Sequence, residues 1–230
     1  MGFALDEVVP WGRSFEEYRA MFDLSEADLA RRILGCSDGP AAFNAKLTQR
    51  GGSVVSVDPI YAFDADAIRD RIAATYEKVL EQARRNAADF VWREITSVEE
   101  LGRTRMAAMS TFLEDLPIGA REGRYVAAAL PSLPFKDREF DLALSSHFLF
   151  TYSDHLTLEF HLESLLELLR NAREVRVFPT IRLDGMLSPY RDEVMHELER
   201  RHFAVKLQRV PYEFQRGGNE MLRVTHAGNG

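Results

Sequence analysis

The sequence predicts an α/β protein whose mostly parallel sheet has helices on both faces and ends in an antiparallel hairpin. Along most of the chain, short apolar segments typical of strands alternate with segments whose apolar residues recur at helical spacing. Parallel neighbours in a sheet need such crossover helices. The last two strand-like segments instead flank the turn Gly217-Gly218-Asn219, which is short enough to join antiparallel strands.

The composition is that of a globular protein, with 230 residues of which 46% are apolar. We expect one domain over residues 1–230. The single cysteine, Cys36, excludes an internal disulfide, and we expect it to serve packing. No apolar run approaches the roughly 20 residues of a membrane span, and the start lacks the pattern of a secretion signal. These features predict a cytoplasmic protein with no membrane partner.

The charge balance argues against a nucleic-acid partner. The chain has 29 basic and 36 acidic residues, a net charge of −7, whereas binding to a phosphate backbone favours a basic surface.

Two short helices are predicted within residues 1–29. Ser14 is followed three residues later by Glu17, and Ser25 is followed three residues later by Asp28. A serine hydroxyl in such a pair can satisfy a free N–H group of the first helical turn.

A strand-helix-strand unit follows over residues 30–61. The order is a strand to Leu34, a turn of small residues, a helix over about 40–50 and a strand over 54–57 that ends at Asp58. Strands are then expected at 125–129, 140–145, 175–178, 204–214 and 221–225, with helices near 153–171 and from Ser188.

Residues 62–123 form a helical insertion after the second strand. Apolar residues recur at helical spacing over 64–90, and Ser97 begins a second helical segment. An insertion of this length can act as a lid over a site, form a contact between two copies of the chain, or thicken the fold. The sequence leaves these three roles open.

The turn GCSDG at 35–39 is the strongest candidate for a ligand site. Two glycines let a backbone approach a ligand closely, and Asp58, at the end of the next strand, is placed to accept the hydroxyls of a ribose. Ser37 and Pro40 stand where a dinucleotide-binding G-x-G-x-x-G motif needs glycine, and no G-K-[ST] follows. A purely structural role for the glycines and Asp58 remains the alternative.

Together, GCSDG, VVSVD at 54–58 and SLPFKDREFDLALSSHFLF at 132–150 resemble a class I S-adenosylmethionine-dependent methyltransferase of the small-molecule type. The similarity covers about 30–62 and 124–225. It implies a Rossmann-like, seven-stranded sheet, S-adenosylmethionine as cofactor, and a small molecule as methyl acceptor. It also implies cofactor-binding roles for the glycine turn, the acid after the second strand and residues after the third and fourth strands: Gly35, Ser37, Gly39, Asp58, Ala129, Leu130 and Ser145.

Three motif positions depart from the family pattern. Ile33 replaces the acid that usually stands two residues before the first motif glycine, Ser37 replaces the middle glycine, and Ala129 replaces an acid or amide. A methyltransferase-like domain that binds S-adenosylmethionine or a related nucleoside without transferring a methyl group is therefore the alternative function.

Catalytic and substrate residues are expected just after the fourth strand. His147 is the candidate general base, with a structural histidine as the alternative, and Tyr152 and His155 are candidates for substrate contact. No metal site is predicted, because the histidines and acids lack ligand spacing such as H-E-x-x-H. The sequence leaves open whether the chain forms a homodimer.

Overall fold

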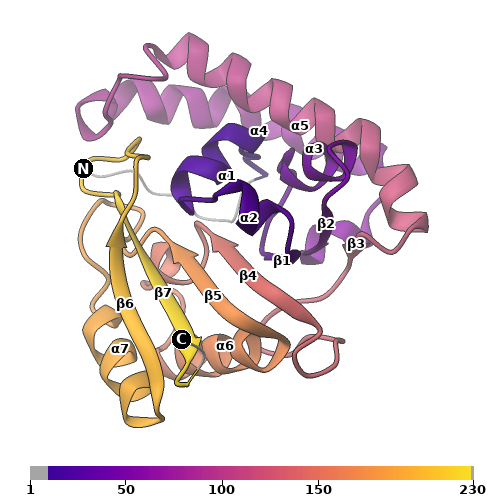
Figure 1. The fold of residues 1–230 in the computed structure, drawn as a ribbon. Helices are drawn as coiled ribbons and strands as arrows, with labels where there is room; N and C mark the ends of the chain where they lie inside the picture. Colours follow the sequence, from indigo (N-terminus) through magenta and orange to yellow (C-terminus); the bar gives the residue numbers. More distant parts are fainter. Residues whose placement is uncertain (1–9, 229–230) are drawn as a thin grey trace.

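The computed structural model describes residues 10–228. Residues 1–9 and 229–230 lie outside the described part, so the predicted N-terminal segment is described from Pro10 onward. Seven strands form one sheet in the order β3-β2-β1-β4-β5-β7-β6 (Figure 1). They are β1 (Arg32–Cys36), β2 (Ser53–Val57), β3 (Tyr125–Val126), β4 (Phe140–Ser146), β5 (Ala172–Phe178), β6 (Phe203–Arg209) and β7 (Glu220–His226).

The sheet is parallel except at one edge, as predicted. β1 pairs in parallel with β2 and β4, whereas β7 runs antiparallel to both β5 and β6. Cys36 at the end of β1 lies opposite Val57 of β2 and Ser145 of β4. The carboxyl ends of these three strands therefore meet at one edge, where ligands bind in parallel α/β sheets.

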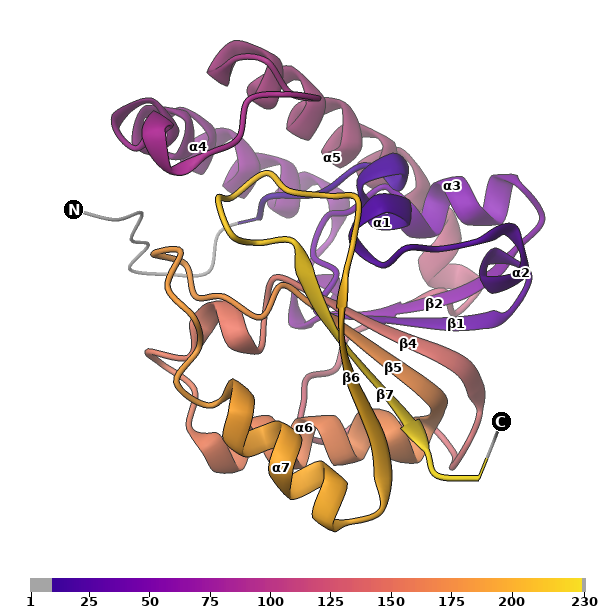
Figure 2. The same ribbon diagram turned by 60° about the vertical axis from the view of Figure 1, so that its left-hand side comes forward.

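Helices cover both faces of the sheet (Figures 1 and 2). On one face lie α1 (Phe15–Met21), α2 (Glu26–Leu29) and α3 (Phe43–Gln49). On the other lie α6 (Leu158–Asn171) and α7 (Arg191–Arg200). The predicted caps are present, because the Ser14 and Ser25 hydroxyls accept from the backbone N–H groups of Glu17 and Asp28.

The insertion consists of the long helices α4 (Ala65–Arg85) and α5 (Val98–Arg121), which pack side by side above α1 and α3 (Figure 1). Short 3-10 turns lie at Pro59–Ala62 before α4 and at Ala87–Asp89 after it. The link between the two helices contacts the β6–β7 connection: the N–H of Val91 donates to the Phe214 carbonyl over 2.7 Å, and the rings of Phe90 and Phe214 stack. The insertion is thus joined to the C-terminal hairpin.

Several segment boundaries differ from the sequence prediction, among them those of β3, β6 and α6. β3 has two residues, and β6 ends at Arg209 because Pro211 follows, which has no N–H to continue the ladder. α6 begins at Leu158 with Thr157 as its cap, rather than near Ser153. The Ser153 hydroxyl instead donates to the Phe150 carbonyl in the 3-10 turn Phe150–Tyr152 and contacts the Ser188 hydroxyl over 2.7 Å.

The sheet lies between two large groups of buried apolar side chains. One is formed with α6 and α7 and includes Leu34, Leu165 and Val175, and the other is formed with α1 and α3 and includes Phe22 and Phe43. Cys36 is buried in the first group, and burial raises the pKa of its thiol. A packing role for Cys36 agrees with this position.

Candidate functional site

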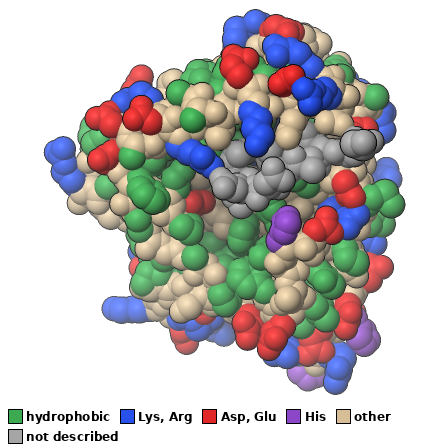
Figure 3. All heavy atoms as spheres, turned by 180° about the vertical axis from the view of Figure 1, so that it is seen from behind, with side chains coloured by type: hydrophobic (Ala, Val, Ile, Leu, Met, Phe, Trp, Pro, Cys, Tyr) green, Lys and Arg blue, Asp and Glu red, His purple; other side chains and the backbone are tan. Residues whose placement is uncertain are grey.

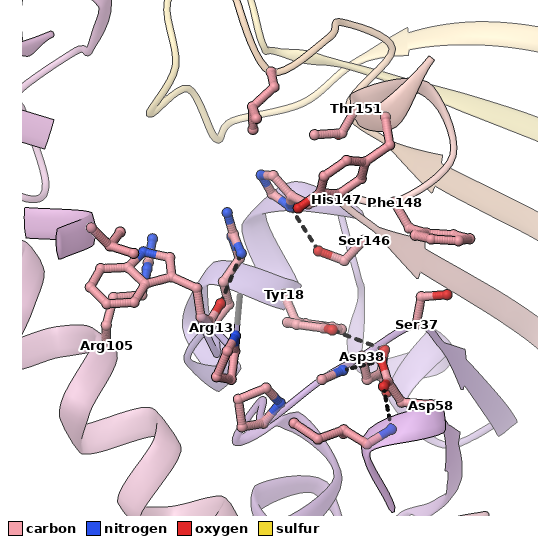
Figure 4. Close-up of a pocket in the computed structure, with 18 of the residues that line it drawn as sticks. Arg13, Tyr18, Ser37, Asp38, Asp58, Arg105, Ser146, His147, Phe148 and Thr151 are labelled. Carbon is pink, nitrogen blue, oxygen red and sulfur yellow. Dashed lines mark hydrogen bonds between the residues drawn. The ribbon is translucent and has the colours of Figure 1, made fainter. Parts of the chain in front are cut away.

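A cavity of about 490 Å³ opens at the carboxyl ends of β1, β2 and β4 (Figure 4). We name its two ends. The turn end is lined by residues that follow β1, β2 and β3: Ser37, Asp38, Gly39, Asp58, Ala129 and Leu130. The arginine end is lined by residues from the N-terminal segment, α5, the β4 end and the β6–β7 connection: Trp11, Arg13, Leu101, Arg105, His147 and Phe214.

The glycine turn has the backbone conformation that its composition favours. Ser37 and Gly39 have φ angles of 58° and 54°, in the left-handed region. A Cβ atom at Gly39 would meet no atom within 4 Å, so the space above this glycine is open. The turn is also fixed to β2, because the N–H of Ser37 donates to the Val57 carbonyl over 2.8 Å.

Asp58 lies directly after β2 and is held by two backbone donors. Its Oδ2 accepts from the N–H of Gly39, and its Oδ1 accepts from the N–H of Ile60, both over 2.9 Å. Burial raises the pKa of Asp58, although these two hydrogen bonds oppose the shift. Each carboxylate oxygen keeps a further lone pair for a ligand donor.

Asp38 forms a second buried carboxylate at the turn end. Its oxygens accept from the Tyr18 hydroxyl over 2.9 Å and from the Ser56 hydroxyl over 2.6 Å. Burial raises its pKa to about 7, against the effect of these hydrogen bonds. The carboxylate lies over Gly35, where a Cβ atom would come within 1.8 Å of Asp38 Oδ2, so position 35 needs glycine.

His147 follows β4 and occupies a constrained position. Its φ angle is 51°, and its backbone N–H donates to the Phe178 carbonyl over 2.7 Å. The ring Nδ1 lies 2.8 Å from the Ser146 hydroxyl oxygen. Burial, and then the charges of Arg13 and Arg105, hold the pKa of His147 well below its usual value. The imidazole is therefore neutral at neutral pH.

A buried ion pair forms the floor of the arginine end. Arg105 is 0% exposed and donates to Glu17, which also accepts from the Tyr212 hydroxyl over 2.9 Å and from the N–H of Ser14. Burial would raise the pKa of Glu17, but the charges of Arg105 and Arg13 lower it to about 2. Glu17 is therefore ionised throughout the physiological range.

Arg13 belongs to the same charged group but has no carboxylate partner. One of its terminal nitrogens donates to the Trp11 carbonyl over 3.1 Å, whereas its Nε is buried without a hydrogen-bond partner (Figure 4). Within residues 10–228, no acid lies within salt-bridge distance of it. Burial and the charge of Arg105 lower the pKa of Arg13.

The structure brings most of the residues predicted from the sequence to this cavity, and the assignment of their roles stays a prediction. Seven of them line the cavity: Ser37, Gly39, Asp58, Ala129, Leu130, His147 and Tyr152. Three do not. Gly35 lies beneath Asp38, Ser145 is buried within β4, and His155 is exposed beyond the end of β4.

Several lining residues were missed by the sequence reasoning. Arg13 and Arg105 are separated by 92 positions and meet only through the packing of α1 against α5, so no motif joins them. Tyr18 was found only as part of a predicted helix, although its hydroxyl binds the carboxylate of Asp38. The segment Trp11-Gly12-Arg13 carries the one local signal: a Cβ atom at Gly12 would lie 2.0 Å from the Pro40 carbonyl oxygen, so a glycine is needed beside the turn.

No group of three or more histidine, cysteine, aspartate or glutamate side chains is arranged to hold a metal ion within 10–228. In the same part of the chain, no helix has the length and apolar character needed to cross a membrane.

No family model matches the sequence. The uncharacterized protein MJ0045 of Methanocaldococcus jannaschii is 34% identical over 223 residues, which cover 96% of this chain and 97% of that protein. The chain belongs to the same family as this archaeal protein.

Solved structures of similar fold include methyltransferases. Magnesium protoporphyrin IX methyltransferase from Synechocystis PCC 6803, crystallised with bound S-adenosylmethionine, is 10% identical with a TM-score of 0.44, and the match covers 93% of this chain and 91% of that one. PH0226 from Pyrococcus horikoshii OT3 is 14% identical with a TM-score of 0.47 over 92% of each chain. A methyltransferase from Methanosarcina mazei is 13% identical with a TM-score of 0.44 over 89% of this chain and 94% of that one. These likenesses concern the fold, and the Rossmann-like methyltransferase fold implied by the sequence resemblance is confirmed.

Proposed function

We propose that this protein binds S-adenosylmethionine at the turn end of the cavity and transfers its methyl group to a small-molecule acceptor at the arginine end. The observation that carries the proposal is the convergence of the open Gly39 turn and the Asp58 carboxylate at one edge of the sheet, where Gly39 N–H binds Asp58 Oδ2 over 2.9 Å. In parallel α/β sheets this edge is the usual place for a nucleotide.

The residues of the turn end fit the chemistry of that cofactor. Asp58 has lone pairs for the two ribose hydroxyls, and Ile60 and Leu130 offer apolar surfaces for an adenine ring. Asp38 supplies a carboxylate beside the turn, although the usual acid is replaced by Ile33, which is fully buried among apolar side chains. We therefore propose that the Asp38 carboxylate takes the role of the acid that Ile33 replaces and contacts the cationic amino group of the cofactor.

The chemistry needed from the protein is modest. When bound, the cofactor supplies an electrophilic methyl group on a sulfonium: a bond forms between the acceptor atom and the methyl carbon while the sulfur–carbon bond breaks. His147 is placed to take the proton that an oxygen or nitrogen acceptor loses, because its imidazole is neutral. The Ser146 hydroxyl at Nδ1 orients the ring, which leaves Nε2 for the acceptor.

The size and charge of the site favour a small-molecule acceptor over a nucleic acid. The volume of the cavity is typical of small-molecule sites. The net charge of −7 disfavours binding to a phosphate backbone. On the face shown in Figure 3, acidic and basic side chains are interspersed around a hydrophobic area and form no continuous basic tract.

The experiment that tests the proposal is calorimetric titration of the purified protein with S-adenosylmethionine and S-adenosylhomocysteine, followed by an assay for S-adenosylhomocysteine release with hydroxyl, amine, thiol and carboxylate acceptors. Binding without release across the panel favours the alternative, a domain that binds the cofactor without methyl transfer. Absence of binding contradicts both.

We also propose that the insertion formed by α4 and α5 covers the acceptor. Val79 and Ala83 of α4, and Leu101 and Arg105 of α5, line the cavity, so both helices contribute to its wall. Cofactor or acceptor should then slow amide exchange over residues 64–123 more than over the hairpin 204–225. Exchange that neither ligand changes would leave a packing or dimer role for the insertion.

A further inference from the structure

Within residues 10–228, the arginine end of the cavity carries more positive than negative charge. Arg13 and Arg105 are accompanied there by one carboxylate, Glu17, which is bound by Arg105. Removing a guanidinium from water is unfavourable unless hydrogen bonds and an opposite charge replace the water. The half-buried Arg13 donates one hydrogen bond, to the Trp11 carbonyl, its Nε is buried without a partner, and no acid of residues 10–228 forms an ion pair with it.

The acids of the turn end do not supply this opposite charge. Neither Asp38 nor Asp58 forms an ion pair with Arg13, because their oxygens accept from the hydroxyls of Tyr18 and Ser56 and from the backbone N–H groups of Gly39 and Ile60. The positive charges of Arg13 and Arg105 contribute to the lowered pKa of His147. In Figure 4 the Arg13 side chain extends toward His147 and away from Asp58. Its charge is therefore located beside the candidate general base.

We propose that Arg13 binds an anionic group of the methyl acceptor, so that the acceptor is an acidic small molecule. The inference rests on the proposed function, since it names the substrate class of that same site. A carboxylate or phosphate can take two parallel hydrogen bonds from one guanidinium, which also fixes its orientation.

The rest of the arginine end defines the body of this molecule. The wall beyond Arg13 is apolar and largely aromatic, and comprises Trp11, Val79, Phe90, Leu101 and Phe214. Such a wall accommodates an apolar or aromatic skeleton attached to the acid. An oxygen neutralised by Arg13 is a weakened nucleophile, so the anionic group orients the acceptor and a different atom, near His147, receives the methyl group.

The first test needs no acceptor. Because no acid of residues 10–228 pairs with the half-buried Arg13 and its Nε has no partner, Arg13→Met removes a charge that this part of the chain does not neutralise, and we expect the Tm of the ligand-free protein to rise by roughly 2 °C or more. Arg105→Met leaves the buried Glu17 without its ion-pair partner and should lower the Tm. Arg209→Met, at an exposed position of β6, is the matched control and should leave the Tm nearly unchanged. A clear fall in the Tm of Arg13→Met would show that Arg13 is structural and would overturn the proposal.

The second test measures charge selectivity on protein saturated with S-adenosylhomocysteine. The probes are indole-3-acetate against indole-3-acetamide, phenylacetate against phenylacetamide, and phenyl phosphate against phenol, titrated into wild type, Arg13→Met and Arg209→Met. We expect wild type and Arg209→Met to bind at least one acid roughly tenfold or more tightly than its neutral counterpart, as one charged hydrogen bond allows. Arg13→Met should lose this preference. No preference for any acid in wild type, or an unchanged preference in Arg13→Met, would overturn the proposal.

A third measurement separates the acceptor from the other source of a carboxylate, the methionyl part of the cofactor. S-adenosylhomocysteine has this carboxylate and 5′-methylthioadenosine lacks it. We expect Arg13→Met to change the affinities for S-adenosylhomocysteine and for 5′-methylthioadenosine by the same small factor. A selective loss of S-adenosylhomocysteine binding would assign Arg13 to the cofactor and overturn the proposal. If wild type binds neither nucleoside, the proposed function fails instead.

Discussion

The two ends of the cavity hold buried charge in opposite ways. At the turn end, Asp38 and Asp58 accept hydrogen bonds from hydroxyl and backbone N–H groups of neighbouring segments. At the arginine end, Arg105 is neutralised by Glu17, whereas Arg13 has no ion-pair partner in the described part of the chain. The two acids are stabilised by hydrogen bonds, and Arg105 is stabilised by its ion pair with Glu17. For Arg13, the anionic ligand proposed above would supply the missing opposite charge. The buried acids of the turn end therefore have their partners without a ligand, whereas Arg13 would gain its ion-pair partner only when the ligand binds.

The largest effect is expected on turnover, at the arginine end. If His147 takes the proton of the acceptor, His147→Ala should lower the rate of methyl transfer by about 10² to 10⁴-fold and leave cofactor affinity nearly unchanged. The measurement is S-adenosylhomocysteine release with a substrate found by the acceptor panel, and His196→Ala, on the exposed face of α7, is the control. Transfer at the wild-type rate would make His147 a structural residue, with catalysis resting on positioning alone.

The next effect concerns stability at the same end. Glu17→Gln keeps the shape of the side chain but leaves the buried Arg105 without its ion-pair partner, which should lower the free energy of unfolding by about 3 to 5 kcal/mol. Urea unfolding measures it, and Glu16→Gln, exposed on the same helix, should change the value by less than about 0.5 kcal/mol. Similar stabilities for the two variants would mean that the buried pair contributes little and that the arginine end tolerates unpaired charge.

At the turn end the main effect is on affinity. Asp58→Ala removes the acceptor for the ribose hydroxyls, and the loss of a charged hydrogen bond of about 1.5 to 3 kcal/mol should weaken S-adenosylhomocysteine binding about tenfold to a hundredfold. Calorimetry gives the dissociation constant, with Asp70→Ala on the exposed face of α4 as control. Equal affinity for Asp58→Ala and wild type would place the ribose elsewhere.

The same comparison explains how much of the site could be predicted from the sequence. Ser37, Asp58 and His147 each follow a strand directly, so the order of elements was enough to place them at one edge of the sheet. Arg13 and Arg105 come from a loop and from the middle of a helix, and they meet only after α5 packs over α1. No local pattern encodes such a contact between residues far apart in the chain.

The fold shows the same division. Strand positions and the sheet arrangement were predicted because apolar runs and turns are local signals. The start of α6 was not predicted. Serine is a common helix cap, but the Ser153 hydroxyl bonds to the Phe150 carbonyl and to the hydroxyl of Ser188, which lies 35 residues away. Tertiary hydrogen bonds therefore decided the boundary where the local signal was ambiguous.

The sharpest test of the turn end is a dependence of stability on pH, with an expected change of no more than about 1.4 kcal/mol per pH unit. The pKa of Asp38 is about 7 in the folded protein because the side chain is buried, whereas an aspartate in an unfolded chain has a pKa near ~3.9. Between these values the folded state keeps a proton that the unfolded chain releases. The stability from this proton is fully present below about pH 4 and is lost as the pH rises through about 7, with a slope of at most about 1.4 kcal/mol per pH unit. Asp38→Asn, which cannot ionise, should remove this slope, so that its stability relative to wild type increases steadily between pH 5 and pH 7 and then levels off. Urea unfolding of both proteins at a series of pH values gives the difference directly, since groups that do not interact with Asp38 titrate alike in the two chains and cancel. Parallel stability curves for wild type and Asp38→Asn would mean that Asp38 is ionised in the folded protein across this range, as strong hydrogen bonds from Tyr18 and Ser56 would require.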